Sequence, residues 1–193
     1  MFKQEFQVFT PQEQDKIINE VLCAQTEWQN AKINPYHYKD TDRAWRYHSH
    51  TCSERVGDHP MFALRLVQRL PDDKPGFVCS PHWLLFEKVF HRAREKMGFP
   101  FSQVLRASIN CTWHHPAPYG VVHKDHYSKP HYNMILQLTP TTAGGTFIFD
   151  DNKELVGESD VAQWSATAFE GLWHAGGFPA PGETRIICVI TWE

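Results

Sequence analysis

The fold of this chain is decided by the stretch TRIICVITW, residues 184–192. Successive side chains of a β-strand point to opposite faces, so this stretch would present two faces. One face carries apolar and aromatic side chains, those of Ile186, Cys188, Ile190 and Trp192. The other carries Arg185, Ile187, Val189 and Thr191. Because both faces hold bulky apolar side chains, we predict a strand that is buried on both sides.

Further runs with strand-like alternation precede this stretch: Val104–Trp113, Tyr132–Leu138, Gly145–Phe149 and Ala166–Phe169. Prolines, glycines and an asparagine, which are typical of turns, separate these runs. Short strands that follow one another without intervening helices indicate an antiparallel sandwich, barrel or jelly roll.

Helices are expected in the first half of the chain. Thr10-Pro11-Gln12-Glu13 has an N-cap threonine, a proline at the first helical position and a glutamate at the capping-box position. A second helix is predicted near residues 60–70, with one apolar face made of Phe62, Leu66, Val67 and Leu70. A third helix is expected to open at Ser80-Pro81 and to end at Gly98-Phe99-Pro100.

Residues 32–58 are polar and aromatic without a clear period, so we expect a loop with one short strand around Trp45–His48. Helices first and strands second give an α+β chain. We therefore expect one structural domain, in which residues 1–100 form a mostly helical support and residues 101–193 form the β core.

Composition restricts the class of protein. The chain has 193 residues, 41% of them hydrophobic, which is enough apolar material for a core. The formal net charge of −3 does not favour nucleic acid as a partner. No stretch approaches the roughly 18 apolar residues of a membrane helix, and the N-terminus lacks the apolar segment of a secretory signal. The five cysteines are scattered, which favours free thiols in a reducing cytoplasm.

A metal site is indicated by the histidines. The chain has twelve of them, and five fall between residues 114 and 131. His123-Lys124-Asp125 is an H-x-D triplet, whose first and third side chains point to the same side of an extended segment. His174 is the best candidate for a third ligand. Two histidines and one carboxylate leave metal positions open, and this arrangement suits non-haem iron(II) better than a closed structural zinc site.

Arg185 is the second candidate functional residue. It would point into the β core together with Ile187 and Val189, where a lone cation is costly unless it meets an anion. The planar guanidinium group of arginine suits a carboxylate. That carboxylate could belong to a bound ligand, or to an acidic side chain of the chain itself in an internal salt bridge.

Together these residues resemble a known family. His123-x-Asp125, the turn Gly144-Gly145-Thr146, and the tail Phe169-x-Gly171-x-x-His174 running to Gly182-x-x-Arg185 resemble the 2-oxoglutarate/iron(II) oxygenases, and most of all their prolyl-4-hydroxylase-like branch. The resemblance covers about residues 104–193. Two positions depart from the family pattern: Ile187 stands where some branches have serine, and Trp113 where a tyrosine is common.

The resemblance implies a double-stranded β-helix, which is a jelly-roll barrel, with iron(II) on His123, Asp125 and His174. It implies 2-oxoglutarate and dioxygen as co-substrates, with the distal carboxylate of 2-oxoglutarate on Arg185, and ascorbate as a stimulant. The implied reaction is a hydroxylation, or a demethylation by the same route, that couples decarboxylation of 2-oxoglutarate to succinate with oxidation of a C–H bond in a second substrate.

Other polar side chains could line the same site. Asn133 and Gln137 share the polar face of the run Tyr132–Leu138, and Asn110 has a similar place on Val104–Trp113; each could bind 2-oxoglutarate or only line a wet barrel wall. The aromatics near the predicted site could be pocket walls or ordinary core. Trp113 is included among the candidates for binding 2-oxoglutarate, and Tyr119 and Trp173 are favoured as pocket walls. The surplus histidines, His114, His115, His126 and His131, are expected at the surface or against the substrate. Arg43, Trp45 and Arg46 could form a loop that faces the substrate.

Three alternatives remain open at this stage. A metallo-β-lactamase-like hydrolase would use His123-Lys124-Asp125-His126, but its motif needs a histidine where Val121 stands. A cupin-like metal enzyme would not use 2-oxoglutarate and would not need Arg185. A jelly-roll binding module would keep the site without catalysis. For an oxygenase, the few lysines and arginines around His114–His126 favour a peptide side chain or a small metabolite as the second substrate.

Overall fold

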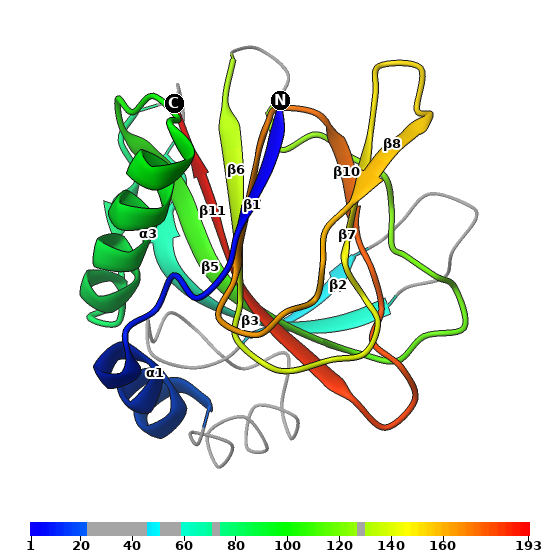
Figure 1. Cartoon of the computed structure of the whole chain (residues 1–193), viewed down its shortest axis with the longest axis horizontal. Helices are drawn as coiled ribbons and strands as arrows, with labels where there is room; N and C mark the ends of the chain where they lie inside the picture. Colours follow the sequence, from blue (N-terminus) through cyan, green and yellow to red (C-terminus); the bar gives the residue numbers. More distant parts are fainter. Residues whose placement is uncertain (23–45, 51–58, 71–73, 127–129) are drawn as a thin grey trace.

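The computed structural model describes residues 1–22, 46–50, 59–70, 74–126 and 130–193. These residues form two antiparallel sheets and two α-helices (Figure 1). The larger sheet has eight strands, in the order β1 (Phe2–Glu5), β9 (Ala166–Glu170), β6 (Tyr132–Gln137), β11 (Thr184–Trp192), β5 (Val104–Trp113), β3 (His59–Gln68) and β2 (Arg46–His50), with β4 (Phe77–Val78) also paired to β3. The smaller sheet contains β10 (Trp173–Gly176), β7 (Thr146–Phe149) and β8 (Leu155–Glu158), in that order.

Strand β11 lies inside the larger sheet, between β5 and β6, and it is buried on both faces as predicted. Cys188, Ile190 and Trp192 belong to the main hydrophobic core, which lies between the sheet and the helices. On the opposite face, Ile187 and Val189 pack in a second cluster together with Ile135, Ile148 and Phe169. Because Ile148 comes from β7, this second cluster joins the two sheets. The result is a jelly-roll-like architecture; closure into a complete barrel stays a prediction.

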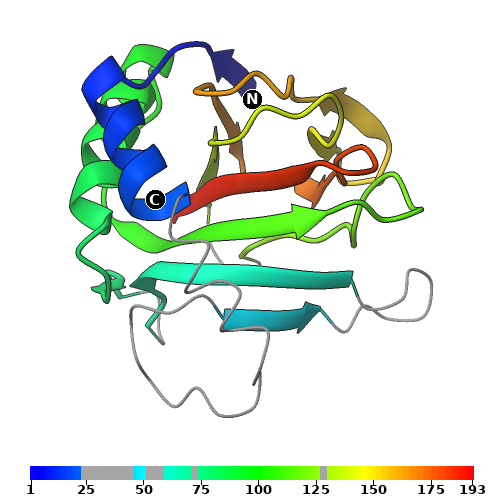
Figure 2. The same ribbon diagram turned by 90° about the horizontal axis from the view of Figure 1, so that it is seen from below.

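The helices lie on one side of the larger sheet, while the smaller sheet faces its other side (Figures 1 and 2). Helix α3 (Trp83–Met97) ends at Gly98, which has a φ of 72°, in the left-handed region that glycine adopts freely. Its buried face consists of Trp83, Phe86, Val89, Phe90, Ala93 and Met97. Phe90 meets Trp192 edge to face at 5.1 Å between ring centroids, so this helix is anchored directly to β11.

Helix α1 (Pro11–Ile17) begins as predicted, with both hydrogen bonds of the Thr10–Glu13 capping box formed. It continues as a short π-helical turn, Ile18–Leu22. Glu13 also binds Arg92 of α3, with Nη2 and Nη1 of the arginine at 2.5 and 3.2 Å from its carboxylate oxygens. The same glutamate therefore caps α1 and forms an ion pair with α3.

The prediction of a helix near residues 60–70 is wrong, because His59–Gln68 forms strand β3. Phe62, Leu64 and Leu66 are buried in the main core, while Arg65 between them is only half-buried. Apolar residues four apart fit a helix, but with Leu64 they also fit the two-residue period of a strand. Pairing with β5 decides between these possibilities.

The first hundred residues therefore contribute more than helices. Strands β1 and β3 pair with β9 and β5, so N-terminal strands are built into the larger sheet. The short strand expected near residue 46 is confirmed as β2, whereas β1, β4, β8 and β10 were not predicted. Arg43 and Trp45 lie outside the described residues. No helix in the described part of the chain is long and apolar enough to cross a membrane.

Candidate metal centre

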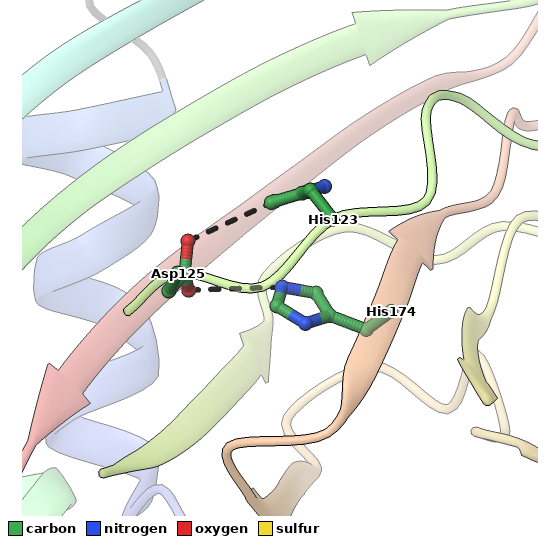
Figure 3. A group of neighbouring side chains, drawn as sticks. All are labelled: His123, Asp125 and His174. Carbon is green, nitrogen blue, oxygen red and sulfur yellow. Dashed lines mark ion pairs between the residues drawn. The ribbon is translucent and has the colours of Figure 1, made fainter. Parts of the chain in front are cut away.

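The three predicted metal ligands converge on one point (Figure 3). His174 lies on β10, and His123 is bound to it through two backbone hydrogen bonds, each of 2.9 Å, one in each direction. Asp125 follows two residues after His123, where the chain bends. The smaller sheet thus holds both histidines side by side, although they are far apart in sequence.

The ligand atoms of the three side chains all lie within 4.8 Å of one another. Asp125 Oδ1 is 3.7 Å from His123 Nε2, and Asp125 Oδ2 is 3.6 Å from His174 Nε2. Two imidazole nitrogens and one carboxylate on a common point form the donor set of a two-histidine, one-carboxylate iron site. Among the described residues this is the only group of three or more such side chains with that spacing.

Both histidines are oriented by the backbone. His123 Nδ1 lies 2.8 Å from the carbonyl oxygen of Val121, and His174 Nδ1 lies 3.0 Å from that of Leu172. A carbonyl oxygen accepts only, so each Nδ1 carries the proton and donates it. Each Nε2 is then left with a lone pair directed at the metal position, as in other histidine-metal sites.

The charges of the site also suit a cation. Burial lowers the pKa of His174 to about 4, although Asp125 opposes the shift, so this imidazole is neutral at neutral pH. Burial alone would raise the pKa of Asp125, but the charge of Arg106, with smaller contributions from His174 and His123, holds it well below its ordinary value. The site therefore offers a metal the neutral imidazole of His174 and the anionic carboxylate of Asp125.

Arg185 is buried, with 2% of its surface exposed, and points to the same side of β11 as Ile187 and Val189. Its Nη2 donates to Thr146 Oγ1 at 3.1 Å, and its buried Nε has no hydrogen-bond partner among the described residues. No described carboxylate forms an ion pair with it. Burial lowers the pKa of Arg185 to about 10, so it stays charged at neutral pH. The internal salt bridge considered above is not formed within the described residues.

The guanidinium group lies close to the metal ligands. A Cβ at Gly176 would be 3.4 Å from Arg185 Nη1, and Gly176 is two residues beyond His174 on β10. Since a strand rises about 3.3 Å per residue, the position that Arg185 approaches lies roughly 7 Å along β10 from His174. Because residues 174 and 176 share one face of β10, the buried guanidinium group lies on the same side of this strand as the imidazole of His174.

The turn Gly144-Gly145-Thr146 supports this geometry. Gly144 has a φ of 94°, and a side chain at Gly145 would overlap the carbonyl oxygen of Ser159. The turn places Thr146 against Arg185, so its glycines are required for the position of the guanidinium group.

The other predicted site residues are only partly brought together. Asn133 lies near the metal end, where its Oδ1 accepts from Thr191 at 2.9 Å. Gln137 donates to Thr139 and Thr141 instead, which engages its amide nitrogen. Asn110 shares the Arg185 face of the sheet beside Ile187. Trp113 does not reach the site, because it lies on the opposite face of β5 and packs on Phe62 at 5.6 Å.

The two aromatic residues that were favoured as pocket walls lie elsewhere. Trp173 precedes His174 on β10 and therefore faces the other side of the smaller sheet, where Lys153 lies 4.7 Å from its ring centroid. Tyr119 packs on Phe147 and Phe149, which alternate with the inward-facing Ile148. Both aromatics thus line the outside of the smaller sheet.

The surplus histidines lie outside the cluster found among the described residues. They were expected at the surface or against the substrate, and the surface is wrong for His131. His131 is buried beside His126, with 5.7 Å between ring centroids, whereas His114 is exposed and lies 3.2 Å from the carbonyl of Pro179. His115 packs near Phe178.

Sequence reasoning missed Arg106 and Thr191, which both contact Asp125. Thr191 was placed on the correct face of its strand, but no pattern indicated its partner.

Comparison with solved structures supports the assignment of the fold. An oxidoreductase of the 2OG-Fe(II) oxygenase family from Burkholderia pseudomallei matches with a TM-score of 0.66 over 99% of this chain and 84% of its own, at 12% identity. A prolyl-4-hydroxylase from Pseudomonas putida matches with a TM-score of 0.55 over 99% and 91%, at 10% identity. This chain has the fold of the 2-oxoglutarate/iron(II) oxygenases.

A third oxygenase fold of this kind is a prolyl hydroxylase from Trichoplax adhaerens, solved with a hypoxia inducible factor peptide fragment; its TM-score is 0.59 over 99% of this chain and 82% of its own, at 10% identity. The sequence itself matches neither a protein-family profile nor a curated protein. With identities this low, the likeness lies in the fold, and the function has to be argued from the site.

Proposed function

We propose that this protein is an iron(II)- and 2-oxoglutarate-dependent dioxygenase. One observation carries the proposal: a histidine–aspartate–histidine cluster shares its face of the fold with a buried arginine that has no internal counter-ion among the described residues. An anion of matching length would neutralise that arginine, and a buried charge without a partner is otherwise costly.

The residues fit the groups that this function requires. His123 and His174 would hold iron(II) through Nε2, and Asp125 through its carboxylate. One anionic ligand leaves a divalent metal with a net positive charge, which favours an anionic chelator such as a keto acid. Arg185 would hold the far carboxylate of that chelator, and Thr146 keeps its guanidinium group in place.

The chain's own contribution is orientation and exclusion of water. When bound, iron and 2-oxoglutarate supply the oxidising chemistry, in which dioxygen is reduced and the keto acid is converted to succinate and CO₂. Ile187 and Val189 lie between Arg185 and Thr191 on β11, so they place apolar surface beside the path from the guanidinium group to Asp125. A dry wall there strengthens the ion pair between Arg185 and a carboxylate.

Two alternatives are weakened by the same observations. A cupin-like enzyme without 2-oxoglutarate gives no reason for a buried Arg185. A metallo-β-lactamase-like hydrolase would need His126 as a ligand, yet His126 is not in the cluster and lies beside His131 instead. A binding module without catalysis would have the same site, so only an activity assay separates it from a dioxygenase.

For the second substrate we propose a peptide side chain or a small molecule. The peptide-bound prolyl hydroxylase among the similar folds is compatible with this choice, and the net charge of −3 does not favour nucleic acid.

The test is release of succinate from 2-oxoglutarate by purified protein with and without iron(II), in air and under nitrogen. We expect iron- and oxygen-dependent release above background even before the second substrate is identified. A protein that binds iron but never converts 2-oxoglutarate, with any candidate substrate, would favour the cupin-like or silent alternatives.

A further inference from the structure

Asp125 is positioned differently from the two histidines. His123 and His174 are fixed by backbone pairing and by hydrogen bonds to carbonyl groups two residues before each of them. Asp125 lies at a bend outside any strand, so no sheet pairing fixes its carboxylate. Its orientation has to come from side chains of other elements.

Those side chains come from the larger sheet. Arg106 on β5 donates through Nη2 to Asp125 Oδ1, and through Nε to Thr191 Oγ1 at 3.1 Å. Thr191 Oγ1 lies 3.4 Å from Asp125 Oδ2 and donates to Asn133 Oδ1 at 2.9 Å. Arg69, just beyond β3, donates to the backbone carbonyl of Asp125 at 2.8 Å.

Arg106 is well placed for this task. It is the direct cross-strand partner of Thr191, and both lie in neighbouring strands inside the sheet. Asp125 is almost fully buried, with a side-chain exposure of 3%, whereas that of Arg106 is 36%. Arg106 therefore reaches from the partly open end of the site to a buried carboxylate.

We propose that Arg106 is a positioning residue of the metal centre: braced against Thr191, it holds Oδ1 of Asp125 and thereby leaves Oδ2, on the His174 side, for the metal. This inference rests on the proposed metal site. An arginine is required because one planar guanidinium group must donate along two directions at once, to Thr191 and to Asp125. The compact ammonium group of a lysine cannot reproduce both contacts.

A positioning role and a purely electrostatic role of Arg106 predict opposite changes in metal affinity when this arginine is removed. A positive charge beside the site repels a divalent cation, so removing it should tighten metal binding if charge alone matters. If Arg106 orients the ligand, its removal should weaken metal binding in spite of the lost repulsion. Changes to residues that orient metal ligands typically cost 10–100-fold in affinity.

The experiment is anaerobic calorimetric titration of the full chain with Fe²⁺, for wild type, Arg106→Met, Arg106→Lys and Thr191→Val. The matched control is Arg65→Met, which removes an arginine from the same sheet at β3, where it binds Gln68 and does not contact Asp125. We expect Arg106→Met to bind Fe²⁺ about 10–100-fold more weakly. Arg106→Lys and Thr191→Val should show smaller losses, and Arg65→Met should match the wild type.

Unchanged or tighter binding in Arg106→Met would overturn the inference, as would an equal loss in Arg65→Met. Thermal unfolding of each metal-free variant shows whether it is folded. If Arg106→Met does not fold, Arg106→Lys and Thr191→Val decide, and wild-type affinity in both would again overturn the inference. Failure of the wild type itself to bind Fe²⁺ is a different result, because it contradicts the proposed function and not the role of Arg106.

Discussion

At the scale of single residues, His174 is the proposed ligand whose removal should damage the site most. It is buried, its Nδ1 is engaged by Leu172, and it comes from a different element than the other two ligands. We expect His174→Ala to abolish Fe²⁺ binding at this site and all turnover. The measurement is Fe²⁺ titration with His126→Ala as the matched control, since His126 is a neighbouring histidine outside the cluster. Retained iron affinity in His174→Ala would show that the metal binds elsewhere.

Arg185 gives a second prediction at this scale. A charge-assisted pair with a carboxylate contributes about 1.5–3 kcal/mol, which corresponds to roughly one to two decades in affinity. Arg185→Met should therefore raise the KM for 2-oxoglutarate about 10–100-fold while Fe²⁺ binding persists. An unchanged KM would mean that the arginine serves the fold alone.

The site residues show what sequence could and could not predict. His123, Asp125 and His174 were found from spacing and order, and the structure places them within 4.8 Å. Arg185 was predicted as a site residue because an arginine among apolar neighbours on a buried strand needs an anion; its burial is confirmed, and its role stays a prediction. Trp113 was misassigned because its strand face was not considered, and Arg106 was missed because its link to Asp125 is a contact between residues 19 apart in sequence.

At the scale of elements, local signals identified the start of α1, the end of α3 and the strands with strict alternation, whereas α3 begins at Trp83 and not at Ser80-Pro81. The capping box of α1 and the glycine end of α3 are both as predicted. Strand β3 was mistaken for a helix because its apolar residues fit both periods, and only pairing with a distant strand resolves this. Strand β10 is four residues long and includes His174, so it was too short for a periodic signal.

The Glu13 cap gives a prediction at this scale. Burial opposes ionisation, but hydrogen bonds from Arg92 and Thr10 lower the pKa of Glu13 below its ordinary value. A lowered pKa in the folded state contributes stability above the unfolded pKa of 4.5, and this contribution is lost as the pH falls below it. Glu13→Gln should lower the free energy of unfolding by about 1 kcal/mol at pH 7, with the difference shrinking toward pH 3.

Denaturant unfolding at the two pH values measures this effect. Glu20→Gln is the control, because Glu20 is more exposed than Glu13 and makes only long ion pairs among the described residues, with Lys16 and with His82, each at 3.8 Å. If Glu13→Gln lowers the free energy of unfolding by the same amount at both pH values, packing and not the charge of Glu13 stabilises the junction of the two helices.

At the scale of the whole molecule, the prediction concerns the class of second substrate. Release of succinate should be stimulated by peptides or small metabolites more than by single-stranded DNA or RNA. The panel should be run at two salt concentrations, because binding to a nucleic acid backbone weakens steeply with salt. Strong, salt-sensitive stimulation by nucleic acid would contradict the proposed substrate class.

The overall architecture followed from sequence only in outline. The β-rich second half and its jelly-roll-like form were expected from short strands without intervening helices. The inclusion of β1 and β3 in the larger sheet was not, because pairing between residues far apart in sequence, such as Phe2 with Phe169 and Phe62 with Cys111, leaves no local pattern. The two sheets nevertheless place Arg185 and His174 on the same side of β10, because Arg185 approaches Gly176, which shares a face of that strand with His174.

The most direct test is a crystal structure of the protein with Fe²⁺ and 2-oxoglutarate, prepared without oxygen. The account predicts metal density bound to His123 Nε2, His174 Nε2 and Asp125, with the keto-acid end of 2-oxoglutarate on the metal and its far carboxylate on Arg185. Metal bound at other residues, or 2-oxoglutarate lying away from Arg185, would contradict it.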